Sequence, residues 1–212
     1  VAIIHHPDIK RMLLTMRATA EGTRAMAIYA ASLYDMEHNH PDATIAADSQ
    51  ALYEFMVPLI KGYSTETSLE TTSLGVQVHG GMGFIEETGA AQYYRDAKIL
   101  TIYEGTTAIQ ANDLVGRKTV RDGGAVAKKI AGMIEQTEAA LAQSGSAEAK
   151  AMLESLTAAR KSFLEVVDFV VANTKADPNA VFAGSVPYLM LAGNLVSGWQ
   201  MARALLVSEQ KL

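Results

Sequence analysis

GVQVHGGMGFIEETGAAQYYRDAKILTIYEGTTAIQ, residues 75–110, is the stretch of sequence that decides the fold and carries the candidate chemistry. It contains two turns broken by glycine, a short polar helical segment and the acidic residue Glu104 directly before Gly105. Long segments with helical periodicity lie on either side of it. This arrangement predicts a functional site in irregular backbone that a helical scaffold holds in place.

Outside this stretch, apolar residues recur at intervals of three and four. We expect a first helix that begins with Asp8 as its N-cap and ends near His38. Pro58 fits the first turn of a helix that the Gly80–Gly81 pair terminates. Further helices are expected at residues 47–56, 88–98 with Thr88 as the cap, 105–115, 125–143, 147–173 and 179–210.

The same periodicity predicts the fold class. Every long segment has the helical period and none alternates with period two, so we expect an all-α protein of bundled helices. Gly123 and Gly124 mark the clearest internal boundary. We therefore expect a helical bundle over residues 1–120 and a second, smaller helical domain over 125–212, truncated at its end.

Composition limits the classes of partner. A net charge of −5 without a basic run argues against a nucleic-acid ligand. No uncharged apolar stretch reaches the roughly 20 residues that a membrane span needs, so we expect none. The chain has no cysteine, which excludes disulfides, thiolate nucleophiles and cysteine metal sites. A cytoplasmic location is the expectation that fits this composition.

The chemistry of the central stretch depends on the position of Glu104. By itself the GGMG sequence is a weak signal, because glycine pairs after a helix usually only terminate it. Glu104, however, directly precedes the start of a predicted helix, whose free N–H groups and positive dipole end favour an anion. Gly105 would let a phosphate or pyrophosphate approach closely.

The segments QVHGGMGF and YYRDAKILTIYEGTTAIQ resemble the C-terminal helical domain of the acyl-CoA dehydrogenases, flavoproteins that oxidise acyl-CoA thioesters to enoyl-CoA. The resemblance extends from Pro7 to Lys118, and its most specific motifs are the glycine turn, RDAKI and YEGT. Residues after Gly124 resemble the additional C-terminal helical domain of a subgroup that includes the methylmercaptopropionyl-CoA dehydrogenase type.

The resemblance implies roles for individual residues. Glu104 matches the base that removes the α-proton of the thioester while a hydride leaves the β-carbon for the flavin. Thr106 matches a threonine near the flavin pyrophosphate, but Ala108 stands where many members have a glutamine that contacts FAD. Tyr103 and Gly105 are expected at the substrate, although core packing is an equal alternative for Tyr103. The residues implied to contact the ADP part of an FAD held by a neighbouring subunit are Gln77, Val78, His79, Gly80 and Gly81.

The implied partners come from the same resemblance. They are FAD, an acyl-CoA substrate, an electron-transferring flavoprotein as acceptor, and further copies of the chain in a homodimer or homotetramer. The strand-rich middle part of the family is missing from these 212 residues, so we expect them alone to bind FAD poorly and to be inactive. Two alternatives remain open, a helical oligomerisation module without chemistry and a sister flavoenzyme of the oxidase type.

Other polar groups are less promising. Arg95 and Asp96 are expected to form a structural ion pair or a helix-end interaction rather than a catalytic pair. No metal site is expected. Four histidines could in principle converge on a metal, but solvated positions at helix ends are the favoured interpretation; they are His5, His6, His38 and His40.

Overall fold

The computed structural model describes residues 1–211 of the chain, and α-helices dominate that part. The expected all-α class is confirmed. The helices are α1 (Pro7–Asn39), α2 (Ala43–Pro58), α3 (Ser64–Val78), α4 (Gly81–Phe84), α5 (Ala90–Leu100), α6 (Thr107–Val115), α7 (Ala125–Ser144), α8 (Ala147–Asn173), α9 (Pro178–Ala183) and α10 (Ser185–Glu209).

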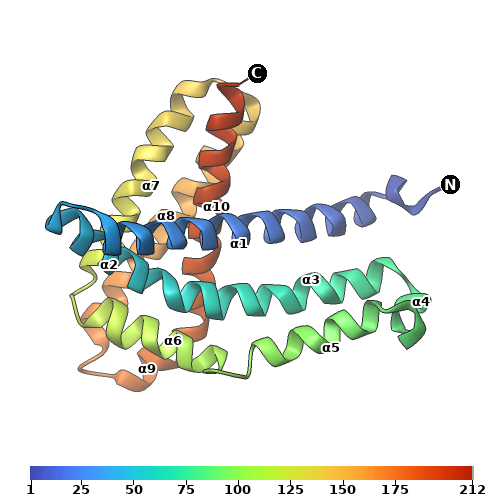
Figure 1. Ribbon diagram of the computed structural model, residues 1–212, viewed down its shortest axis with the longest axis horizontal. Helices are drawn as coiled ribbons and strands as arrows, with labels where there is room; N and C mark the ends of the chain where they lie inside the picture. Colours follow the sequence, from blue (N-terminus) through green and yellow to red (C-terminus); the bar gives the residue numbers. More distant parts are fainter. Residues whose placement is uncertain (212) are drawn as a thin grey trace.

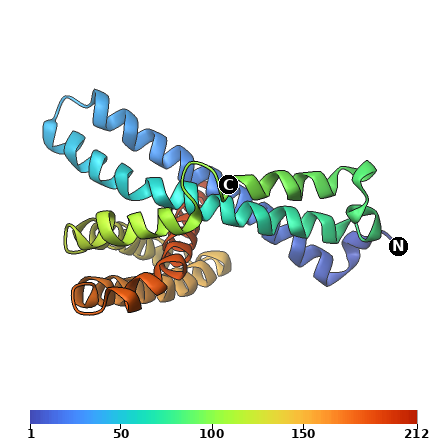
Figure 2. The same cartoon turned by 90° about the horizontal axis from the view of Figure 1, so that it is seen from below.

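The helices form two groups that cross each other, one built on α1, α3 and α5 and the other on α7, α8 and α10 (Figure 1). Helices α1, α3 and α5 run side by side and form an elongated arm, with α4 at its far end near the N-terminus (Figure 1). Helices α7, α8 and α10 pack together and rise steeply from that arm (Figure 1), and Figure 2 shows the arm extending well beyond them. No helix in the described part is long and apolar enough to cross a membrane.

Helices α2 and α3 are joined without a loop. Pro58 is the last residue of α2 rather than part of the first turn of the next helix, so that prediction is wrong. Proline has no N–H to donate, and the chain continues through a π-helical turn over Leu59–Tyr63 before α3 begins. The resulting rod extends from Ala43 to Val78 and stops at Gly80, whose φ of 61° only glycine adopts readily.

Three other predicted helix ends need correction. Helix α1 begins at Pro7 with His6 as its N-cap residue, so Asp8 lies within the first turn. Helix α5 begins after Gly89, in the left-handed conformation with φ 85°, and Thr88 belongs to the preceding short 3₁₀ turn. The last predicted helix is interrupted at Gly184, which separates α9 from α10. Pro7 and Gly89, each next to a predicted cap, set the first two boundaries, and Gly184 interrupts the last predicted helix from within.

The α10 helix binds the two groups together through close contacts at glycines. A Cβ atom at Gly22 of α1 would lie 2.2 Å from Oγ of Ser197, and one at Gly193 would lie 2.2 Å from Cγ of Tyr63. Small residues at these points let the backbones approach closely. The buried core consequently runs without interruption from α1 and α2 through α6 and α10 to α7 and α8.

Candidate functional site

A tight loop between α5 and α6 carries Glu104. The amide of Thr107 donates to the carbonyl of Thr101 at 3.3 Å, which closes the loop at its base. Thr106 is the N-cap of α6, and its hydroxyl accepts a hydrogen bond from the amide of Ile109 at 3.4 Å. The predicted opening of this helix is confirmed, and the cap keeps the loop's exit in one conformation.

The backbone of Glu104 is left-handed. With φ 50° it is the one residue other than glycine in residues 1–211 with a positive φ, and Gly105 follows with φ 96°. A β-carbon in this conformation crowds the following carbonyl, at a cost of roughly 1–2 kcal/mol. Such strain persists only where the surroundings impose it, and it concentrates at functional sites.

The α2–α3 rod supplies side chains that hold this loop. Lys61 donates from Nζ to the carbonyl of Leu100 at 2.5 Å and lies over the ring of Tyr103, 4.9 Å from its centroid. On the next turns of the rod, Glu66 accepts a 2.5 Å hydrogen bond from the hydroxyl of Thr107. Lys61 and Glu66 were not predicted from the sequence, because each is about 40 positions from its partner and lies in no recognisable motif.

The loop faces outward on this chain. Glu104 is exposed, and Tyr103 is 46% exposed, which rules out core packing within this chain as the role of that tyrosine. Large apolar side chains are exposed along α4, α5 and α6, on both sides of the loop. They are Met82, Phe84, Ile85, Tyr93, Tyr94, Ile99, Ile102, Tyr103 and Ile109. So many exposed apolar side chains in one segment are typical of a region that another part or partner covers.

The glycine turn lies at the other end of α5. His79 Nδ1 is 2.8 Å from the carbonyl oxygen of Gly75, and Gly80 and Gly81 have open space where side chains would otherwise stand. The 11 residues of α5 separate this turn from the Glu104 loop by about 16 Å along the helix. One chain therefore brings Tyr103, Glu104, Gly105 and Thr106 together but keeps residues 77–81 apart from them.

A groove adjoins the glycine turn. It has a volume of about 250 Å³ and lies between α1, α3 and the start of α5, with His79, Gly75, Met16 and Tyr93 among its walls. The hydroxyl-rich part of α3 forms another wall. There Thr72 donates to the carbonyl of Ser68 at 2.8 Å, so it turns a methyl group outward and leaves the groove largely apolar.

The remaining candidates are separate from this region. Arg95 pairs with Glu86 at 3.1 Å rather than with Asp96, so the expected ion pair has a different acid. The 33 residues of α1 place its two end groups of histidines about 50 Å apart. His38 Nδ1 lies 2.9 Å from the carbonyl of Tyr34 at one of those ends.

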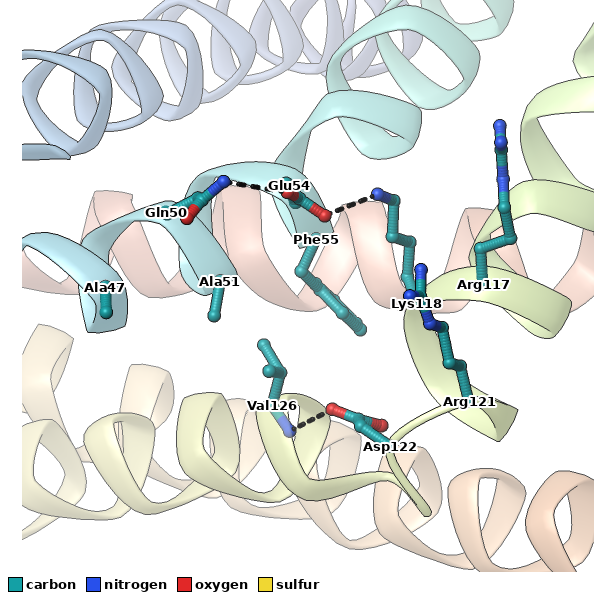
Figure 3. Close-up of a pocket in the computed structure, with 10 residues that line it drawn as sticks. All are labelled: Ala47, Gln50, Ala51, Glu54, Phe55, Arg117, Lys118, Arg121, Asp122 and Val126. Carbon is teal, nitrogen blue, oxygen red and sulfur yellow. Dashed lines mark hydrogen bonds and ion pairs between the residues drawn. The ribbon is translucent and has the colours of Figure 1, made fainter. Parts of the chain in front are cut away.

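A larger cavity of about 410 Å³ lies between α2 and the turn before α7, at the opposite end of α6 from Glu104 (Figure 3). Part of its charge is matched within the chain. Lys118 pairs with Glu54 at 3.0 Å, and the carboxylate of Asp122 accepts a 2.9 Å hydrogen bond from the amide of Val126 (Figure 3). A second 2.9 Å hydrogen bond reaches Asp122 from the amide of Gly124. The Lys118–Glu54 pair joins α2 to the π-helical turn Gly116–Val120 that follows α6.

Comparisons with known proteins point to the same family as the motifs of residues 75–110. The family model of the acyl-CoA dehydrogenase C-terminal domain matches residues 1–119, and that of the acetyl-CoA dehydrogenase C-terminal-like domain matches residues 126–212. The 3-methylmercaptopropionyl-CoA dehydrogenase of Ruegeria pomeroyi is 53% identical over the whole chain. A broad-specificity linear acyl-CoA dehydrogenase of Mycobacterium tuberculosis is 35% identical, also over 100% of this chain.

The chain spans 36% of the length of each of these two relatives. Among solved structures, ACDH-11 of Caenorhabditis elegans in complex with C11-CoA covers 93% of the chain and 32% of its own, with a TM-score of 0.76 at 20% identity. That likeness shows a shared fold. The chain belongs to the acyl-CoA dehydrogenase family and matches its C-terminal domain.

Proposed function

We propose that this chain supplies the catalytic base of an FAD-dependent acyl-CoA dehydrogenase, and that the base is Glu104. The observation that carries the proposal is the left-handed backbone of Glu104 in a loop fixed by Lys61, Thr101 and Thr107. A carboxylate held at an energetic cost in a braced loop is suited to a task that demands one position.

The carboxylate of Glu104 removes the α-proton of an acyl-CoA thioester. FAD, if bound, would supply the acceptor for the hydride that leaves the β-carbon. Tyr103 lies beside the base and forms an apolar wall that Lys61 keeps in place. Exclusion of water from Glu104 requires a cover over the exposed apolar side chains of α5 and α6, which we expect further parts of the complete protein to provide.

The residues near Glu104 fit a phosphate-bearing cofactor. The hydroxyl of Thr106 accepts from the amide of Ile109, so its proton is free to donate to a ligand oxygen. Gly105 has no side chain that would block the approach of a ligand to the hydroxyl of Thr106. Ala108 offers a methyl group here, so a glutamine contact common in the family has to come from elsewhere.

Two copies of the chain would complete the FAD site. Residues 77–81 lie about 16 Å along α5 from Thr106. The glycine turn would contact the ADP part of the FAD held mainly by a neighbouring copy. This separation supports a homodimer or a dimer of dimers, in which each copy contributes its glycine turn to its neighbour.

The Glu104→Gln variant of the complete protein tests the base. We expect it to bind FAD and acyl-CoA like the wild type and to lose about 100-fold to 10,000-fold in thioester oxidation, because an amide cannot take the proton. Glu87→Gln, an exposed glutamate in the same stretch, is the control and should keep full activity. Unchanged turnover with bound flavin in Glu104→Gln would contradict the assignment.

The proposed acceptor is an electron-transferring flavoprotein. The alternative, an oxidase-type enzyme, differs in how the reduced cofactor is reoxidised. Stopped-flow reoxidation of the substrate-reduced complete protein should be fast with the flavoprotein and slow in air. Fast reoxidation by oxygen alone would favour the oxidase, and a colourless complete protein would favour a helical module without chemistry.

A further inference from the structure

A groove of about 550 Å³ lies between α1 and the C-terminal half of α10, the red helix that rises from α1 in Figure 1. Arg203 and Gln200 of α10 face Tyr29 and Ile28 of α1 across it. Neither the Glu104 loop nor the glycine turn contributes to its walls. The groove is therefore a separate feature, and its polar groups call for an explanation of their own.

The guanidinium group of Arg203 is held in one orientation. Its Nη1 atom donates to Oε1 of Gln200 at 2.9 Å, and its central carbon lies 5.4 Å from the ring of Tyr29 and 5.5 Å from the ring of Trp199. Trp199 is itself fixed by a 2.8 Å hydrogen bond from Nε1 to Thr137. Hydrogen bonding and two aromatic faces thus preorganise a cation.

The guanidinium group of Arg203 has no acidic partner among the described residues. Within residues 1–211, no carboxylate oxygen lies within 4.0 Å of the Arg203 nitrogens, whereas Arg160 on α8 pairs with Glu135 and Glu138. Gln200 uses only the Nη1 edge of the guanidinium. The remaining N–H groups of the fork are available to a planar, bidentate partner.

The amide of Gln200 gives a second, independent indication. Gln200 is 7% exposed, and its Nε2 atom is buried without any hydrogen-bond partner among the described residues. Buried donors are nearly always satisfied in native proteins, so this unpaired amide calls for an acceptor that the described residues do not supply. Because Nε2 is enclosed, the amide has to turn toward the groove to reach an acceptor there. The amide and the guanidinium of Arg203 are both donors, which selects an anion with acceptor oxygens.

The rest of the groove is apolar. Ile28 and Val207 are 64% and 50% exposed on its two sides. The hydroxyl of Ser32 donates to the carbonyl of Tyr29 at 2.7 Å, and that of Ser208 donates to the carbonyl of Ala204 at 2.8 Å. A ligand with one anionic head and an aliphatic body would match both parts of the groove.

We propose that the groove between α1 and α10 binds a small aliphatic carboxylate, with the carboxylate on the open edge of Arg203 and next to the amide of Gln200. The planar fork favours a carboxylate, and Ile28 and Val207 contact the aliphatic chain. The site is separate from the proposed base, so it does not depend on the role of Glu104.

Titration calorimetry of the complete protein with octanoate tests the site, with saturating acyl-CoA present to block the Glu104 region. Octanoate should bind, whereas uncharged octanol and short-chain acetate should each bind more weakly. Arg203→Gln should weaken octanoate by about ten-fold or more, the effect of losing one charge-assisted hydrogen bond. Arg24→Gln, an exposed arginine on α1 outside this groove, is the matched control and should bind normally.

Gln200→Glu provides a second variant. It places a carboxylate next to Arg203, which should occupy the guanidinium and abolish octanoate binding without unfolding the protein, as circular dichroism would verify. The proposal is overturned if the wild type does not bind octanoate, if octanol binds equally well, or if a folded Arg203→Gln or Gln200→Glu variant binds octanoate as tightly as the wild type.

Discussion

Glu104 combines the carboxylate proposed as the base with a left-handed backbone conformation that is unfavourable for residues with a β-carbon. The preceding helix, the closed loop base and Lys61 of the α2–α3 rod together impose this conformation. A glycine at this position would relieve the strain but would remove the carboxylate. The side chain thus costs stability where the proposed chemistry needs it.

Paired substitutions measure this cost. Glu104→Gly should be more stable than Glu104→Ala by about 1 kcal/mol, because only alanine keeps the left-handed penalty. At Glu154, an exposed position inside α8, the order should reverse, with alanine about 1 kcal/mol more stable than glycine. Urea unfolding of the four variants gives both differences. The same order at the two positions would contradict a left-handed Glu104.

At the scale of the elements, α10 determines how the arm and the C-terminal helices meet. Its contacts with α1 and with the π-helical turn depend on glycines that have no room for a Cβ atom. The π-helical turn begins directly after Pro58, and Tyr63 at its end fills the space above Gly193. The π-helical turn after Pro58 therefore determines how α10 packs against the α2–α3 rod.

Two alanine substitutions in α10 separate packing from helix propensity. Gly193→Ala should destabilise the protein by about 1–3 kcal/mol, because its Cβ would overlap the side chain of Tyr63. Gly198→Ala, with no atom within 4 Å of the new Cβ, should stabilise it by about 0.5–1 kcal/mol. Thermal unfolding checks both, and a Gly193→Ala protein at least as stable as the wild type would contradict the packing.

The end of α10 is tied to the turn between α7 and α8 by a carboxylate. Ser144 and Ser146 each donate a 2.5 Å hydrogen bond to Glu209, and these bonds lower the pKa of Glu209 below its ordinary value of 4.5. Because the pKa of Glu209 is lower in the folded protein than in the unfolded chain, the contact stabilises the fold at pH values above the unfolded-state pKa. This stabilisation is lost as the pH falls through the folded-state pKa.

Carboxyl NMR titration tests this contact. Ser144→Ala should raise the pKa of Glu209 toward the ordinary value, because the first of the two donors is removed. Ser155→Ala, an exposed serine in α8, should leave the titration of Glu209 unchanged. A Glu209 pKa that is identical in the wild type and in Ser144→Ala would contradict the proposed hydrogen bond.

At the scale of the whole molecule, the proposed site is incomplete within one copy of this chain. The Glu104 loop and the glycine turn occupy opposite ends of α5, and the apolar surface between them is exposed. The proposed homodimer or homotetramer and the remaining parts of the protein would cover that surface. The division into residues 1–120 and 125–212 remains a prediction, and one continuous core spans both segments.

Residues 1–212 expressed alone should not retain FAD, because each copy presents only separate parts of the site. The complete protein should be purified with bound flavin. Each protein is mixed with FAD and passed through a gel-filtration column, and the flavin absorbance of the two protein peaks is then compared. Stoichiometric FAD on the isolated chain would show that the cofactor site does not need the rest of the protein.

The sequence by itself determined the helical class and the break between helices around Glu104. Helical periodicity and the glycines at 80 and 105 act over a few residues, so they can be identified along the chain. The left-handed backbone of Glu104 and the cap at Thr106 were not predicted. The same locality explains the errors at Pro58, Gly89 and Gly184. Each of these residues permits more than one boundary, and the surrounding packing selects one.

Only the tertiary structure decided which distant groups meet. The contacts of Lys61 with Tyr103, Glu66 with Thr107 and Arg203 with Tyr29 join different elements. Their formation depends on the crossing of the helices, which is set by side-chain packing at Gly22 and Gly193. No spacing along the chain encodes that crossing, because the free energy of core packing is gained only when the helices assemble.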